Sequence, residues 1–325
     1  MRISRREALA GSAATLASLG AATAACRTDS PRLDDSRQAR PTAASSNERS
    51  VVKLVPAQRT MDGAGVRLKR ALGGSALPML DPFLLLDEFQ SDDPNDYLAG
   101  FPDHPHRGFE TVTYMIDGAM EHKDSVGNRG RLVSGSAQWM TAGHGIVHSE
   151  MPKQERGLMW GYQLWVNLPR SRKMIRPRYQ DIGPGRIPEI EHEGARIRVV
   201  AGEAFGTTGP VEGIDVEPVF LDVAMKKGMT FSTPLPPDHN AFVYVADGAV
   251  RLGPSRTEAS RGTLALLGSG DRFSAMCDAD SGRMLVLAGR PIGEPVARRG
   301  PFVMNTEDEI KQAWEDYRSG RLVGG

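Results

Sequence analysis

Histidines gather in one short stretch of this 325-residue chain. An even spread of the seven histidines would place about one in any 45 residues, but five lie within such a stretch: His104, His106, His122, His144 and His148. On a β-strand, side chains i and i+2 face the same way. His104 and His106 should therefore project together, as should His148 and Glu150. If these pairs lie on neighbouring strands, three imidazoles and one carboxylate converge.

That set of donor groups suits a divalent transition metal, and Fe(II), Mn, Ni, Cu and Zn are all compatible with it. An ion that prefers six ligands would keep two positions for water, substrate or dioxygen. Glu110, four residues after His106, would reach the same face on a continuous strand and competes with Glu150 for the carboxylate role. One histidine pair alone is more often just hydrogen-bonded inside a barrel, so the metal prediction rests on the two pairs together.

The segments that must position these residues indicate an all-β protein. Glycine (36) and proline (22) are plentiful and punctuate short apolar runs, which is typical of strands joined by tight turns. The run 113–120 reappears at 243–250 with Tyr, Asp, Gly and Ala identical, which indicates two copies of one unit. In each copy the Asp-Gly pair predicts a β-hairpin. We expect each half to be an antiparallel barrel or jelly roll.

The second copy lacks the histidines of the first. At the 130-residue offset, the positions corresponding to the four candidate ligands hold Pro234, Pro236, Asp278 and Asp280. We therefore expect a metal-binding domain at 51–180 and a metal-free domain at 181–325. A capping box at Thr306 and Glu309 predicts one short helix that ends near Gly320 and closes the chain.

The N-terminus resembles a twin-arginine export signal. Arg5 and Arg6 precede a weakly apolar run of mostly small residues, which has too few large side chains for a permanent membrane span. We expect residues 1–25 to be this signal and residues 26–50 to be a disordered tether. The protein would then be periplasmic. Ala22-Thr23-Ala24 suits an ordinary signal peptidase, whereas Ala24-Ala25-Cys26 resembles a lipoprotein site, where a lipid on Cys26 would be the one attachment to a membrane.

Composition argues against other function classes. Lysine plus arginine and aspartate plus glutamate each total 40, so the chain has no basic surplus with which to bind nucleic acid. Of the two cysteines, only Cys277 falls in the predicted folded part, which rules out a disulfide framework there. Cys277 also has no histidine near it in the sequence, which argues against cysteine hydrolase chemistry.

Several longer motifs follow one another in a fixed order. They are Asp81–Phe89 (DPFLLLDEF), His104–Tyr114 (HPHRGFETVTY), Trp139–Gly143 (WMTAG), Ile146–Pro152 (IVHSEMP), Gly289–Pro295 (GRPIGEP) and Gly300–Thr306 (GPFVMNT). Together they resemble the pirin family of the cupin superfamily over roughly residues 51–320. The resemblance implies a bicupin with a mononuclear Fe(II) site in the N-terminal barrel. It implies His104, His106, His148 and Glu150 as the ligands and Glu110 as a nearby non-ligand.

Members of this family resemble quercetin 2,3-dioxygenases, which open the central ring of a flavonol with O2 and release carbon monoxide. A metal would lower the pKa of the flavonol hydroxyl, and Glu150 or Glu110 would accept its proton. Phe109, Trp139 and Met140 are candidates to line the substrate cavity. The alternative is a metal-tuned binding or regulatory module without catalysis. A partner protein remains open in that case, although export argues against an intracellular transcription partner.

Overall fold

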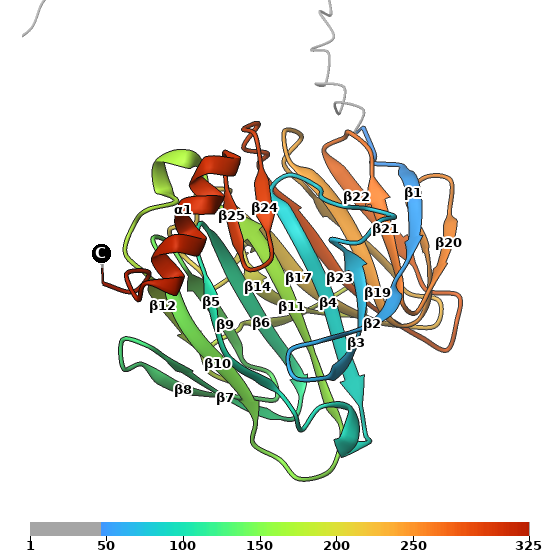
Figure 1. Ribbon diagram of the computed structural model, residues 1–325. Helices are drawn as coiled ribbons and strands as arrows, with labels where there is room; N and C mark the ends of the chain where they lie inside the picture. Colours follow the sequence, from blue (N-terminus) through green and yellow to red (C-terminus); the bar gives the residue numbers. More distant parts are fainter. Residues whose placement is uncertain (1–46, 325) are drawn as a thin grey trace, which may run out of the picture. The chain divides into compact units, whose positions relative to one another are not determined.

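The computed structural model describes residues 47–324. The predicted export signal, Cys26 and most of the predicted tether lie outside this range. The described chain consists of strands with one α-helix near its end, which confirms the predicted all-β class (Figure 1). Within residues 47–324, no helix is both long enough and apolar enough to cross a membrane.

The N-terminal barrel is built from two antiparallel sheets. The larger has seven strands in the spatial order β12 (Arg178–Ile182), β9 (Ala137–Thr141), β6 (Phe109–Asp117), β11 (Met159–Asn167), β4 (Phe83–Ser91), β3 (Val66–Leu72) and β2 (Gln58–Asp62). The smaller has four, in the order β5 (Phe101–His106), β10 (Ile146–Pro152), β7 (Ala119–Asp124) and β8 (Arg129–Val133). Apolar side chains from both sheets, including Phe89, Met115 and Met120, pack together between them.

The C-terminal barrel is one ten-stranded, branched sheet. Seven strands follow each other in the order β1 (Val51–Pro56), β21 (Thr263–Leu267), β19 (Asn240–Leu252), β23 (Ser281–Gly289), β17 (Val219–Lys226), β14 (Ala195–Ala201) and β13 (Glu189–His192). The branch holds β18 (Thr230–Pro234), β20 (Thr257–Ser260) and β22 (Arg272–Met276). The short elements are β15 (Glu203–Ala204), β16 (Thr207–Thr208), β24 (Ala297–Arg299), β25 (Phe302–Met304), the 3-10 turns η1 (Pro94–Asp96) and η2 (Arg170–Arg172), and α1 (Glu307–Arg318).

Both Asp-Gly pairs lie where the chain changes its pairing partners. Asp117 ends β6, and Gly118 leads into β7, which pairs with β8 and β10 rather than with β6. In the second copy, Asp247 and Gly248 lie within β19, which pairs first with β21 and β23 and then with β20 and β22. The two glycines have φ of +95° and +66°. The hairpin prediction is therefore wrong: a glycine at positive φ permits a sharp bend but does not dictate which strand pairs next.

A shared core joins the two barrels. The outer faces of β6 and β11 supply Tyr114 and Tyr162, which pack with Phe220, Phe242 and Tyr244 from the C-terminal sheet. These side chains are almost completely buried. Burying them supplies the main apolar stabilisation of the contact between the barrels.

Each end of the described chain crosses to the other barrel. The first strand joins the C-terminal barrel, and the last segment joins the N-terminal barrel. β1 pairs with β21 of the C-terminal sheet, from Val51 opposite Leu267 to Pro56 opposite Thr263. Arg49, assigned to the tether by its sequence, is buried and donates to the carbonyls of Gly268 and Pro236. The segment of β24, β25 and α1 packs on the N-terminal barrel, where Val303 contacts Leu84 and Phe109. The expected domains are 51–180 and 181–325. In the structure, the first strand of the first range belongs to the C-terminal barrel, and the last segment of the second range packs on the N-terminal barrel.

The C-terminal helix follows its sequence prediction. Thr306 Oγ1 accepts from the Glu309 amide at 3.2 Å, and the Glu309 carboxylate accepts from the Thr306 amide at 3.0 Å. This reciprocal capping box satisfies two of the amides left unpaired at the start of a helix.

Candidate metal centre

Three histidines meet where β5 and β10 pair. His148 lies opposite His104 in the antiparallel register, and His106 follows two positions later on the same face of β5. Each imidazole offers one nitrogen, and these three nitrogens lie within 4.8 Å of one another. The centroids of the His104 and His148 rings are 4.4 Å apart. The two-residue spacing of His104 and His106 thus combines with the pairing of β5 and β10, which adds His148, to produce the cluster.

The protonation and hydrogen bonding of the cluster suit a metal ion. His104 Nδ1 lies 2.8 Å from the Pro102 carbonyl, and His106 Nδ1 faces the Pro301 carbonyl at 3.5 Å, which leaves each Nε2 for a ligand. Within residues 47–324, neither nitrogen of the buried His148 has a hydrogen-bond partner. Burial, reinforced by the neighbouring imidazoles, holds the pKa values of His106 and His148 well below their usual range. Neutral imidazoles are the form that coordinates a divalent cation.

Glu150 lies on the cavity side of β10 but stands apart from the three-nitrogen group. Thr113 Oγ1 donates to its Oε1 at 2.6 Å, and Gln163 Nε2 donates to its Oε2 at 2.8 Å. These two donors, from β6 and β11, fix the orientation of a carboxylate that is 2% exposed. The carboxylate is thus close enough to the imidazoles to share their cavity, and it is held by neutral side chains rather than by a counter-charge.

Glu110 does not share the face of His106. β5 ends at His106 and β6 begins at Phe109, so the expected continuous strand does not exist. Between them Gly108 has φ +86°, and a Cβ there would come within 2.0 Å of the Val303 carbonyl. Glu110 instead accepts from Thr141 Oγ1 at 2.6 Å and from Trp139 Nε1 at 3.0 Å. On β6 it shares its face with Val112, which packs in the core between the barrels.

A cavity of about 570 Å³ opens beside the cluster. Phe109, Trp139 and Met140, the lining side chains expected from the sequence, are buried and do not line it, although the Phe109 ring packs directly behind His106 and Trp165. The side chains that do line its apolar part come from several strands: Leu68, Leu85, Phe89, Phe101 and Trp165. Side chains alternate between the two faces of a strand, so Leu85 and Phe89 share a face with Asp87 on β4, and Trp165 shares one with Gln163 on β11. This alternation identifies the lining side chains only once β4 and β11 are known to border the site.

The C-terminal segment completes the wall of this cavity with Arg298, Gly300 and Pro301. Lys173 anchors it: the buried ammonium donates to the Gly108 carbonyl at 2.8 Å, to Asn167 Oδ1 at 2.7 Å and to the Val303 carbonyl at 3.1 Å. Burial lowers the pKa of Lys173 to about 8. His144, another histidine of the sequence cluster, takes part through its main chain: its carbonyl accepts a hydrogen bond from Arg107 Nε. Sequence reasoning missed the C-terminal segment of β24, β25 and α1 because it begins about 150 positions after the last of the three histidines.

The comparable strand pair in the C-terminal barrel packs apolar side chains into the core. β22 pairs with β18 as β10 pairs with β5. Phe231, Phe273 and Ala275 from these two strands pack in an apolar cluster. Within residues 47–324, the three histidines form the only group of three or more His, Cys, Asp or Glu side chains close enough to share an ion.

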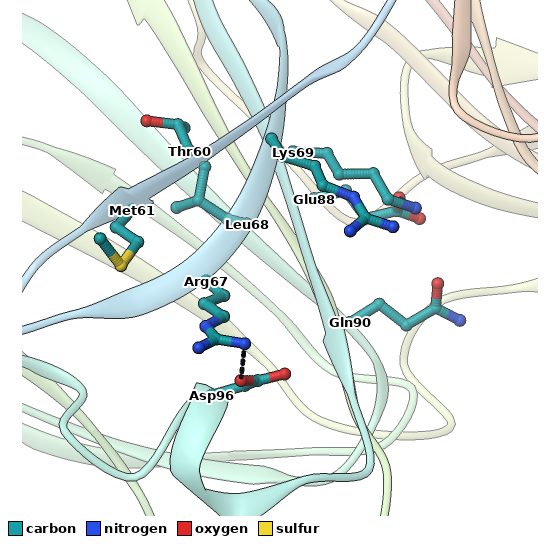
Figure 2. A pocket seen from close by; sticks show the side chains of 9 residues that line it. Thr60, Met61, Arg67, Leu68, Lys69, Glu88, Gln90 and Asp96 are labelled. Atoms are coloured by element: carbon teal, nitrogen blue, oxygen red, sulfur yellow. Dashed lines mark hydrogen bonds and ion pairs between the residues drawn. The ribbon is translucent and has the colours of Figure 1, made fainter.

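A second cavity, of about 610 Å³, lies along β2, β3 and β4 (Figure 2). Its charged groups largely neutralise each other: Arg67 lies 3.2 Å from Asp96, and Lys69 lies 3.3 Å from Glu88. Glu88 also accepts from the hydroxyls of Tyr162 and Tyr244, at 3.0 and 2.8 Å. This carboxylate therefore belongs to the polar network at the contact between the barrels, and the cavity beside the histidines is the candidate functional site.

Two family models match the chain in order. A model described as Pirin covers residues 65–166, and one described as Pirin C-terminal cupin domain covers residues 220–323. A pirin-like protein of Caulobacter vibrioides is 50% identical over 278 residues, which are 84% of this chain and 99% of the relative. A Pseudomonas aeruginosa protein named provisionally as a quercetin 2,3-dioxygenase is 46% identical over 281 residues, which are 85% of this chain and 98% of the relative.

Solved structures show the same architecture. A crystal structure of quercetin 2,3-dioxygenase from Acinetobacter baumannii is 34% identical, with a TM-score of 0.79 over 85% of this chain and 98% of that one. A bacterial pirin from Escherichia coli, crystallised in complex with nickel(II), has a TM-score of 0.57 over 74% of this chain and 98% of that one. Its identity is 21%, so this likeness concerns the fold alone. The family models, the two-barrel fold and relatives that match along almost their whole length agree: the chain belongs to the pirin family and is a bicupin.

Proposed function

We propose that this chain is a metal-dependent dioxygenase that opens a flavonol with O2 at a mononuclear iron centre. The observation that carries the proposal is the cluster of His104, His106 and His148, of which the first two line a cavity of about 570 Å³ together with Glu150. Cavities of this size accommodate small organic ligands. The names of the Pseudomonas and Acinetobacter relatives support the same reaction.

In this proposal His104, His106, His148 and Glu150 hold the metal. The metal, when bound, supplies Lewis acidity toward the flavonol hydroxyl and the redox chemistry with O2. Fe(II) is our first choice, and Mn, Ni, Cu and Zn suit the same donors. The apolar side chains of Leu85, Phe89 and Trp165 orient a planar aromatic ring and limit the access of water.

Glu150 accepts the proton of the substrate hydroxyl. Thr113 and Gln163 each occupy one of its oxygens, so the carboxylate is oriented while each oxygen keeps capacity to accept another hydrogen. A proton acceptor held in this way satisfies the geometric condition for a general base. Glu110 has no such role in our proposal, because its carboxylate is engaged by Thr141 and Trp139 outside the cavity.

The test is the stoichiometry of the reaction. Iron-loaded protein should consume one O2 and release one CO for each quercetin, whereas protein stripped by a chelator should consume none. A matched variant, His148→Ala, should behave like the stripped protein because it removes one imidazole of the cluster. If iron-loaded protein consumes no O2 with quercetin or any other flavonol, the catalytic proposal fails and a metal-tuned binding module takes its place.

A further inference from the structure

Arg298 places a positive charge in the wall of the cavity, near enough to His106 to contribute to the lowered pKa of that imidazole. It belongs to β24 of the C-terminal segment and lines the same cavity as His106 and Glu150. Its Nη1 donates to the Leu84 carbonyl at 3.0 Å, and its Cζ lies 4.6 Å from the centroid of the Trp165 ring. The guanidinium is therefore fixed at one end by the backbone and stacked on an aromatic face.

The charge of Arg298 is not neutralised by an ion pair within residues 47–324. The neighbouring Arg70, in contrast, makes a two-pronged contact with Asp87, at 2.8 and 2.6 Å, and a further one with Asp62 at 2.8 Å. For Arg298 the one hydrogen bond found in this part of the chain is that to Leu84, which leaves its other N–H groups for a ligand. Burial lowers the pKa of Arg298, and the nearby charge of Arg70 lowers it further. The carboxylates of Asp87 and Asp62, which are paired with Arg70, offset part of this effect.

The indole ring of Trp165 contacts both this cation and the metal-binding side. Trp165 stacks with Arg298 and also packs edge-on against His106, with ring centroids 5.3 Å apart. A planar aromatic substrate that reaches the histidines and packs along Trp165 would therefore also come within reach of Arg298. In a half-buried site of this kind a charge-assisted hydrogen bond is stronger than on an open surface.

We infer that Arg298 is a specificity-determining residue: it receives an anionic group, a phenolate or carboxylate, on the part of the aromatic substrate that does not bind the metal. The inference rests on the proposed function for the orientation of the substrate. It narrows the substrate class to hydroxylated aromatic compounds that carry a second, acidic group. Leu85 and Phe89 alone would select only for apolar surface, whereas Arg298 discriminates by charge.

The experiment compares two flavonols in the absence of O2. Quercetin and 3-hydroxyflavone share the hydroxyl and carbonyl that face the metal, but only quercetin has further phenolic groups. We expect Arg298→Met, which keeps much of the side-chain length, to weaken quercetin binding by about tenfold or more. Binding of 3-hydroxyflavone should change by less than about twofold. Arg298→Lys keeps the charge and should retain part of the preference for quercetin over 3-hydroxyflavone. That result would show that the weaker quercetin binding of Arg298→Met is not caused by loss of folding.

Arg299→Met is the matched control, since Arg299 is exposed and lies outside the cavity lining. If Arg298→Met leaves the ratio of the two affinities unchanged, or if Arg299→Met alters it equally, the inference is overturned. Binding without O2 also separates this inference from the catalytic proposal. A quercetin preference that depends on Arg298, in a protein that never consumes O2, supports the inference and contradicts the dioxygenase. Failure of both flavonols to bind the metal-loaded wild type overturns the inference.

Discussion

The guanidinium of Arg107 lies 2.8 Å from the carboxylate of Asp316, although 209 positions separate the two residues in the sequence. Arg107 directly follows the candidate ligand His106, and Asp316 lies in α1, near the end of the chain. Their side chains are 5% and 16% exposed, so solvent screens the pair only weakly. The pair therefore ties the C-terminal helix to the strand end that carries two candidate ligands.

Asp316→Asn should destabilise the protein because it leaves the buried Arg107 without its counter-charge. Breaking a fully buried pair costs about 3–5 kcal/mol and breaking an exposed one costs under about 1 kcal/mol, so we expect about 2 kcal/mol here. Urea unfolding measures the change. Glu315→Gln, at the exposed neighbour on the same helix, should stay within about 0.5 kcal/mol. Equal stability of the two variants would show that the contact with Arg107 contributes nothing.

Glu150→Gln and Glu110→Gln separate the two candidate carboxylates. Glutamine is a weaker ligand and cannot act as a base, so at position 150 we expect oxygen uptake with quercetin to fall about 10²–10⁴-fold. At position 110 we expect a loss of less than about threefold, since that side chain faces the core between the barrels. An oxygen electrode measures both, with metal content as the control. If Glu110→Gln is the more damaging change at full metal content, our assignment of the base is wrong.

Glu110 should also make the metal-free protein less stable as the pH rises from 5 to 8. Burial raises its pKa from an ordinary 4.5 to about 7. Between these values the folded state keeps a proton that the unfolded state has lost, so stability falls with rising pH. The Glu110→Gln variant lacks this titration, and its amide can still accept from Trp139 and donate to Thr141. The Tm of the variant relative to wild type should therefore increase from pH 5 to pH 8. A constant difference would contradict the raised pKa.

Local patterns predict the clustered histidines but not the wall that faces them. The His-x-His spacing identifies two side chains that share a strand face, and the pairing of β5 with β10 then brings His148 to them. The pairing of β1 with β21 and the placement of Arg298 depend on contacts across more than 200 residues. No periodicity within one strand carries that information. The Asp-Gly turns fail for a related reason, because both a hairpin and a change of pairing partners use the same glycine conformation.

Export is a prediction from residues outside the described range. Replacing both Arg5 and Arg6 by lysine should leave the protein in the cytoplasm, because the twin-arginine pair is recognised by a receptor. Cell fractionation of the natural host measures this, with the unchanged protein as the control. Delivery to the periplasm or membrane that does not depend on the two arginines would show that the segment is not such a signal.

The metal content of the purified protein tests the central claim most directly. Elemental analysis of iron-loaded, full-length protein should give about one metal ion per chain, and His148→Ala should retain almost none, because loss of one buried imidazole weakens coordination sharply. His192→Ala, at an exposed histidine of the C-terminal barrel, should keep the full equivalent. Two ions per chain in the wild type, or an undiminished ion in His148→Ala, would contradict a single metal centre at His104, His106 and His148.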